Sequence, residues 1–125
     1  MTLHQMNLQE RYFDYIQTGT KRIELRLYDD KRRQIKLGDE IEFAKSDTAK
    51  LKAQVIGLLL YNSFEELFED LPMELLADKT MTKSELLGVL GEFYTKEQQQ
   101  KYGVVGIRLK ILPKQKPPQI GAVQI

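Results

Sequence analysis

The sequence contains no cysteine and only one histidine, and these two scarcities exclude several classes of chemistry. Without cysteine there can be no disulfide, no thiolate nucleophile and no cysteine-based zinc site. The lone His4 rules out a metal site built from several histidines. No phosphate-binding loop, nucleophile elbow or metal signature is present in the sequence either. We therefore expect no metal site and no bound cofactor.

Long hydrophobic runs and a large excess of one charge are also missing. The longest apolar run, residues 55–61, is far too short to cross a bilayer. The N-terminal sequence MTLHQMNLQE has no basic region followed by an apolar run, so no signal peptide is visible. These observations predict a cytoplasmic protein without a membrane partner. The formal net charge of +1 means that any contact with nucleic acid must come from a local patch.

What is present is a regular succession of short elements in a chain of 125 residues, enough for one domain with a substantial core. Residues 9–17 predict a helix that buries Phe13 and Ile16 and ends at Gly19. Asp29 or Asp30 is suited to cap a short turn through residues 31–33. Alternating apolar residues predict strands at residues 2–8, 19–29, 40–44, 50–61 and 103–111, with a tight turn at residues 37–39.

Three capping boxes predict a group of short helices between the last two strands. Ser63, Thr82 and Thr95 each precede Glu or Gln by three residues, the spacing that satisfies free amides at a helix N-terminus. The first helix is predicted to end near Asp70, before the break expected at Pro72, and the second near residue 92. The domain is predicted over residues 1–112. Residues 113–125 hold three of the four prolines and predict an extended or disordered tail.

The segment GTKRIELRLYD, residues 19–29, carries the most specific pattern. Its apolar residues Ile23, Leu25 and Leu27 fall on one side of a strand, while charged residues 22, 24 and 26 fall on the other. A glutamate between two arginines is unfavourable in a poorly solvated place unless it is paired. The simplest interpretation is a solvated face with weak mutual ion pairing. The alternative is a binding site in which basic groups hold a phosphate and a carboxylate accepts a proton of a base or sugar.

Lys21, His4 and Tyr94 each have a structural and a functional interpretation. Lys21 lies on the apolar side of the alternation, where it either extends to solvent or has a lowered pKa and acts as a base. His4 is either a hydrogen-bonded structural residue or a catalyst. Tyr94 either packs in the core or stacks on a base.

The succession of elements suggests an α+β fold, with a small, mostly antiparallel barrel that avoids open edges and has helices packed outside it. The segments GTKRIELRLYDDKRRQIKLGDEIEF, YNSFEELFEDL and YTKEQQQKYGVVGIRL, in this order, resemble the ASCH domain of the PUA-like superfamily. This resemblance covers nearly everything from residue 2 to about residue 111. It implies a PUA-like β-barrel with flanking short helices, and a cleft between barrel and helices that is proposed to bind RNA or a modified nucleoside.

Carried over from the family, the cleft positions fall on Lys21, Glu24, Arg26 and Asp29, with Arg32 nearby. His4 and Tyr94 are weaker candidates for nucleic-acid or nucleotide binding.

Some small bacterial members of the family are acetylcytidine amidohydrolases, and this chain is similar to them only in part. Lys21 and Arg26 match their lysine and arginine, but Glu24 stands where they have a threonine nucleophile. Their catalytic glutamate falls where this chain has Lys79, with Asp78 beside it. The resemblance therefore predicts that this chain does not hydrolyse acetylcytidine by that mechanism. Other members are reported as ribonucleases, in which Lys21 and Glu24 would serve as base and acid.

Three functional hypotheses remain open from the sequence. The leading one is an RNA- or nucleotide-binding module with a charged cleft beside the barrel. The second is an enzyme acting on RNA or a modified nucleoside, with Lys21 and Glu24 as its catalytic candidates. The third is an interaction domain that binds a protein partner through the proline-containing tail.

Overall fold

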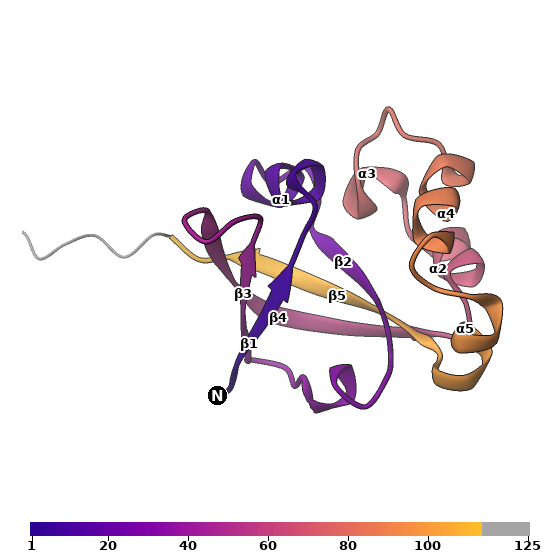
Figure 1. Ribbon diagram of the computed structural model, residues 1–125, viewed down its shortest axis with the longest axis horizontal. Helices are drawn as coiled ribbons and strands as arrows, with labels where there is room; N and C mark the ends of the chain where they lie inside the picture. Colours follow the sequence, from indigo (N-terminus) through magenta and orange to yellow (C-terminus); the bar gives the residue numbers. More distant parts are fainter. Residues whose placement is uncertain (114–125) are drawn as a thin grey trace, which may run out of the picture.

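Five strands form a single sheet in the order β1-β3-β4-β5-β2 (Figure 1). The computed structural model describes residues 1–113. Three of the four strand pairings are antiparallel, and only β1 and β3 run parallel. The strands are β1 (Leu3–Asn7), β2 (Ile23–Leu27), β3 (Glu40–Ala44), β4 (Lys50–Tyr61) and β5 (Val104–Ile111).

The sheet curves into a half-barrel, so the predicted α+β, mostly antiparallel PUA-like architecture is confirmed. The expectation that the barrel would avoid open edges is wrong for the described residues, because β1 and β2 end the strand order and do not pair with each other. A side chain bridges these two edges instead. Arg26 Nη2 on β2 donates a hydrogen bond of 3.0 Å to the backbone oxygen of Asn7, at the end of β1.

Short helices flank the sheet, and most of them begin where the capping residues predict. In Figure 1, α2 to α5 gather at one end of the long strands β4 and β5, while α1 lies nearer β2. Thr82 and Thr95 form complete capping boxes, and Ser63 accepts a hydrogen bond from the Glu66 amide. The helices of the described residues are α1 (Glu10–Gln17), the 3-10 turn η1 (Arg32–Gln34), α2 (Phe64–Asp70), α3 (Met73–Leu76), α4 (Lys83–Gly91) and α5 (Lys96–Tyr102).

Strand β2 separates two hydrophobic cores and contributes a different row of side chains to each. Ile23, Leu25 and Leu27 pack against α2, α3 and α4 in the helix-side core. Glu24 and Arg26 lie opposite Ile107 and Val105 of β5, which belong to the barrel-side core. Directly opposed residues of an antiparallel pair share one face of the sheet, so Glu24 and Arg26 face the barrel. Both faces of β2 are therefore covered.

Gly106 of β5 lets the side chains of Ile23 on β2 and Leu67 on α2 pack closely over the sheet. A Cβ atom at this position would lie 3.0 Å from Cγ2 of Ile23 and 3.4 Å from Cδ1 of Leu67. This close packing fixes where the helical layer stands relative to β2, and hence relative to the charged residues on its other face. Within residues 1–113, no helix has the length and apolar character needed to cross a membrane.

Candidate functional site

A cleft of about 150 Å³ lies beside β2, between the β1–α1 segment and helix α4. Its lining is mostly apolar, with a few convergent charged and polar groups, which is the usual composition of a small-molecule site. The volume is similar to that of a cavity that accepts one benzene ring, and it is below the roughly 300 Å³ at which drug-sized pockets begin. The lining residues are Asn7, Leu8, Gln9, Tyr12, Lys21, Glu24, Leu25, Arg26, Leu86, Val89, Leu90, Phe93 and Tyr94.

Lys21 enters this cleft because the chain turns sharply after α1. Gly19, with φ of 79°, ends the helix, and the Lys21 amide then donates to the backbone oxygen of Tyr15 over 2.9 Å. The side chain is only 3% exposed, so the interpretation of Lys21 as a solvent-reaching surface lysine is wrong. Its Nζ donates to the backbone oxygens of Ile23 over 2.6 Å and Leu76 over 2.5 Å.

Glu24 holds the two basic residues together. Its Oε1 accepts a hydrogen bond of 3.1 Å from the Leu25 amide and lies 3.4 Å from Lys21 Nζ. Its Oε2 accepts from Arg26 Nε over 3.1 Å and from Arg26 Nη2 over 3.0 Å. A carboxylate has about four lone-pair sites, and all four face a donor here. Glu24 is 5% exposed, so the interpretation of a solvated charged face is wrong for this strand.

Arg26 uses only part of its guanidinium to bind Glu24 and Asn7. Its Nε and Nη2 donate to Glu24, and Nη2 also donates to Asn7. Nη1 takes no part in these bonds, and the polar group that also interacts with the guanidinium is Tyr94, which helps to raise its pKa. A guanidinium is charged throughout the physiological range and has five donors. Arg26 therefore has donor capacity left after Glu24 and Asn7 are satisfied, in a cleft where Lys21 has already used its donors and Glu24 its acceptors.

The charges of the three residues depend on one another. Burial lowers the pKa of the Lys21 ammonium, and the Glu24 carboxylate offsets only part of this effect. Burial alone would raise the pKa of Glu24, but the positive charges of Arg26 and Lys21 outweigh it and hold the pKa below its ordinary value. The three acceptors around Lys21 Nζ match its protonated form. The group then has one negative and two positive charges and attracts an electron-rich ligand.

Aromatic residues form the walls of the cleft. Phe93 is 55% exposed although it is large and apolar, and the Tyr94 ring lies 6.3 Å from it, between centroids. Burial opposes the charge of Arg26, but Glu24 and then the nearby Tyr94 raise the pKa of its guanidinium. Tyr12 has a buried hydroxyl oxygen with no hydrogen-bond partner among residues 1–113. One exposed ring and an unpaired polar atom are what a site for a planar, hydrogen-bonding ligand would contain.

The structure therefore brings Lys21, Glu24, Arg26 and Tyr94 to one cleft and leaves the other sequence candidates outside its lining. Asp29 and Arg32 pair with each other over 3.0 Å in the segment after β2. His4 Nε2 lies 2.9 Å from Asp39 Oδ2, next to the turn before β3. Asp39 also accepts hydrogen bonds from the backbone amides of Thr2 and Lys36, so this group ties the N-terminus to the turn.

Tyr12 and Phe93 are cleft residues that the sequence interpretation missed. Tyr12 precedes the buried Phe13 on a short amphipathic helix, and such a position looks like a boundary of the core. Phe93 follows α4, where the apolar pattern of the helix has already ended. Within residues 1–113, no three of the histidine, aspartate and glutamate side chains are grouped to hold a metal ion.

The fold and this cleft define a class: an α+β domain with a PUA-like half-barrel and a charged cleft beside its helices. The ASCH domain model matches residues 6–113, and the chain belongs to the ASCH domain family. This family is generally associated with RNA binding.

Solved structures agree with this assignment. Hypothetical protein PH0355 is 40% identical, with a TM-score of 0.80, and the match covers 89% of this chain and 100% of that one. Protein PF0455 from Pyrococcus furiosus is also 40% identical, with a TM-score of 0.73 and coverage of 89% and 98%. A mutant of the ASCH protein from Zymomonas mobilis shares the fold at 13% identity, with a TM-score of 0.54 and coverage of 94% and 84%. No curated protein matches the chain.

Proposed function

We propose that this protein is an RNA- or nucleotide-binding module whose cleft takes up one nucleobase. The observation that carries the proposal is Arg26 Nη1, which Glu24 and Asn7 leave unused beside Tyr94, in an otherwise mostly apolar cleft with the volume of a single ring. Glu24 is a positioning residue in this account, because all of its acceptor sites already face donors of the protein. A carbonyl oxygen or ring nitrogen of a base would accept from Nη1 and from the Tyr12 hydroxyl.

The aromatic residues support a base rather than a small inorganic anion. A base presents a flat face as well as hydrogen-bond acceptors, and stacking on an aromatic side chain is worth about 1–3 kcal/mol per base. Phe93 and Tyr94 lie at the cleft with Phe93 largely exposed, so a ring is available for stacking at its mouth. Tyr94 also packs on Phe64 of the core, but an anion alone would use Arg26 and leave the exposed Phe93 ring unexplained.

The test is a thermal-shift screen of nucleosides, nucleotides and short RNAs against matched variants. A ligand that binds only the folded state raises the melting temperature of the protein, and the shift grows with the ratio of ligand concentration to dissociation constant. Phe93→Ala should reduce the shift by removing the stacking contact, with little change in the unliganded protein because the side chain is largely exposed. Leu37→Ala is the matched control, since Leu37 is 66% exposed and lies outside the cleft lining.

The outcomes separate a specific site from general attraction. A nucleoside that stabilises the wild type and Leu37→Ala, but not Phe93→Ala, supports the proposal. Equal shifts in both variants would place the ligand elsewhere on the surface. If no nucleoside, nucleotide or RNA shifts the wild-type melting temperature at low salt, the proposal fails and a protein-interaction function becomes the better account.

One observation favours a second candidate, an enzyme that acts on RNA or a modified nucleoside. A buried lysine with a lowered pKa next to a carboxylate is a common arrangement in catalytic sites. The hydrogen bonds of Lys21 Nζ to two backbone oxygens oppose this function, because they hold its protons in a structural role. Cleavage of RNA that is abolished by Lys21→Met, in a variant that remains folded by circular dichroism, would favour the enzyme.

A further inference from the structure

Lys21 also lines a second hollow, which we call the basic groove and which has a volume of about 330 Å³. The groove lies on the outer face of β4 and β5, next to residues 19–22 before β2 and to helix α3. Its lining residues are Gly19, Lys21, Arg22, Ile23, Ile56, Leu75, Arg108, Leu109, Lys110 and Ile111. Only Lys21 and the strand β2 connect it with the cleft, so it is a separate feature of the surface.

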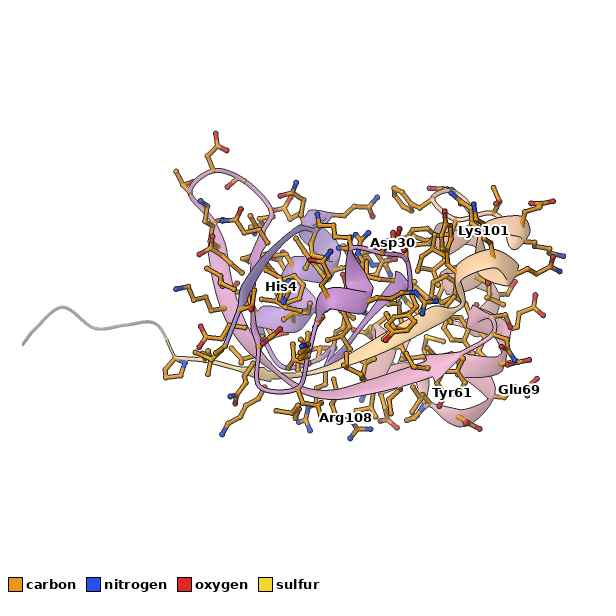
Figure 2. The ribbon with its side chains drawn as sticks, turned by 90° about the horizontal axis from the view of Figure 1, so that it is seen from below. His4, Asp30, Tyr61, Glu69, Lys101 and Arg108 are labelled. Carbon is orange, nitrogen blue, oxygen red and sulfur yellow. The ribbon has the colours of Figure 1, made fainter. Side chains whose placement is uncertain are left out.

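Three exposed cations line the groove, and none is neutralised. Arg22, Arg108 and Lys110 make no ion pair among residues 1–113. No aspartate or glutamate belongs to the groove lining. The protein as a whole has nearly balanced charge, with 19 basic and 18 acidic side chains, so a place with cations alone is a local exception. Arg108 projects outward at the periphery of the molecule in Figure 2.

The backbone holds these cations at defined places. The Arg22 amide donates to Leu75 of α3 over 2.8 Å, and its carbonyl oxygen accepts from the Leu109 amide over 2.9 Å. Arg108 lies opposite Gly57, next to an irregularity in β4. A Cβ at position 57 would lie 3.0 Å from the Arg108 Cβ, so glycine is what allows the arginine stem to cross β4 there. Arg108 and Lys110 are two residues apart on one strand, roughly 6.6 Å.

Apolar side chains lie beside the cations. Ile56 is 49% exposed and Ile111 is 37% exposed, and both belong to the groove lining. A single nucleic-acid strand has both chemistries, since its phosphates attract cations and its sugars and bases cover apolar or aromatic groups. The charge of the groove is complementary to such a backbone and would oppose a basic partner.

We propose that the basic groove binds the phosphate backbone of single-stranded RNA, through Arg22, Arg108 and Lys110. This inference rests on the proposed function for the identity of the ligand, but it concerns a different part of the surface. The cleft would take up a base, whereas the groove would contact the charged backbone and add affinity that is independent of sequence.

The test measures the salt dependence of binding to a labelled oligouridylate by fluorescence anisotropy. Each phosphate contact of a single strand contributes a slope of about −0.7 to log affinity against log salt concentration. The double variant Arg108→Gln with Lys110→Gln should therefore have a slope shallower by about 1.4, and weaker binding at low salt. The matched control is Lys79→Gln with Lys83→Gln, which removes the same charge from exposed residues outside the groove lining.

A second probe isolates the backbone from the bases. A peptide nucleic acid of the same sequence keeps the bases and has no phosphates, so its binding should be weak and unaffected by the groove variant. The groove proposal is overturned if the groove and control variants lose the same slope, if the uncharged probe binds as well as RNA, or if no oligouridylate binds. Inorganic polyphosphate or polyglutamate that competes as well as RNA would also overturn it, because the groove would then bind anions without regard to RNA.

The experiments distinguish a failure of the groove proposal from a failure of the cleft proposal. Nucleoside binding that depends on Phe93, together with an unchanged salt slope in the groove variant, would retain the cleft and overturn the groove. A slope that depends on the groove, with no nucleoside binding, would retain the groove as an RNA-backbone site and overturn the cleft.

Discussion

Arg26 has the central role at the scale of single residues. It neutralises the buried Glu24, joins the unpaired edges of the sheet through Asn7, and leaves Nη1 beside Tyr94, where a ligand could accept from it. Removal of one partner of a buried ion pair destabilises a protein by about 3–5 kcal/mol. A change at Arg26 would therefore alter stability and binding together, and the sharper tests lie at neighbouring residues with one role each.

Tyr12 is such a residue, because its hydroxyl has no partner among the described residues of the unliganded protein. A buried hydroxyl without a hydrogen bond destabilises the folded state by about 1–3 kcal/mol. Tyr12→Phe should therefore raise the free energy of unfolding by about 1 kcal/mol, measured by urea denaturation, and weaken base binding at the same time. A variant that is less stable would mean that the hydroxyl has a structural partner, and unchanged affinity would exclude it from the binding site.

The low pKa of Asp39 predicts that the folded protein loses stability at acid pH. Its hydrogen bond with His4, together with those from the amides of Lys36 and Thr2, lowers its pKa to about 2. In the unfolded chain an aspartate has a pKa of about 3.9, so the folded state binds this proton less readily. The resulting stability is present above about pH 4 and is lost as the pH falls from about 4 to 2.

Asp39→Asn removes this titration. The variant should be less stable than the wild type at about pH 6, and the difference in melting temperature between the two should shrink as the pH falls to about 2. A constant difference across this range would show that the ionisation of Asp39 does not stabilise the folded state.

At the scale of elements, Gly106 determines how closely the helical layer packs on the sheet. Gly106→Ala would force its Cβ against Ile23 and Leu67, and such overpacking destabilises a core by about 1–3 kcal/mol. Gly88 in α4 is the matched control, because a Cβ there meets no atom within 4 Å. Gly88→Ala should stabilise the protein by about 0.5–1 kcal/mol through helix propensity. Urea denaturation of both variants checks the prediction, which is contradicted if both changes have the same sign.

Much of the element pattern could be predicted from the sequence, because alternation and capping are local signals. Strands β3 and β4 have the predicted bounds, and helices α2, α4 and α5 begin at the predicted capping residues. The short helix α3 was missed, because Pro72 indicates a break in the chain but gives no sign of a new helix beyond it. The tail was predicted over residues 113–125. All of it except Pro113 lies outside the described residues.

The candidate site could be predicted only in part, and β2 explains why. Alternation separates Ile23 and Leu25 from Glu24, but it does not reveal that both faces of the strand are covered. That depends on long-range pairing with β5 and on the packing of α2. The same limitation hid Tyr12 and Phe93, which line the cleft only because α1 and the end of α4 border it in the folded chain.

At the scale of the whole molecule, this chain combines the ASCH fold with a cleft built on Lys21, Glu24 and Arg26. Glu24 stands where the resemblance to acetylcytidine amidohydrolases would require a threonine nucleophile, and its carboxylate is already engaged by four donors. We therefore predict no turnover of acetylcytidine, measured as release of cytidine by chromatography. Turnover by the wild type that disappears in Glu24→Gln would contradict this prediction and show that the carboxylate reacts.

The central claim is that a base enters the cleft and meets Arg26, and nuclear magnetic resonance tests it most directly. A titration of the ¹⁵N-labelled protein with nucleosides and nucleoside monophosphates would follow the backbone amides and the Arg26 guanidinium signals. The account predicts that at least one nucleoside shifts signals of Arg26, Phe93 and Tyr94 together, while signals of His4 and Asp39 stay in place. Shifts confined to residues outside the cleft, or none at millimolar concentrations of every nucleoside and nucleotide, would contradict it.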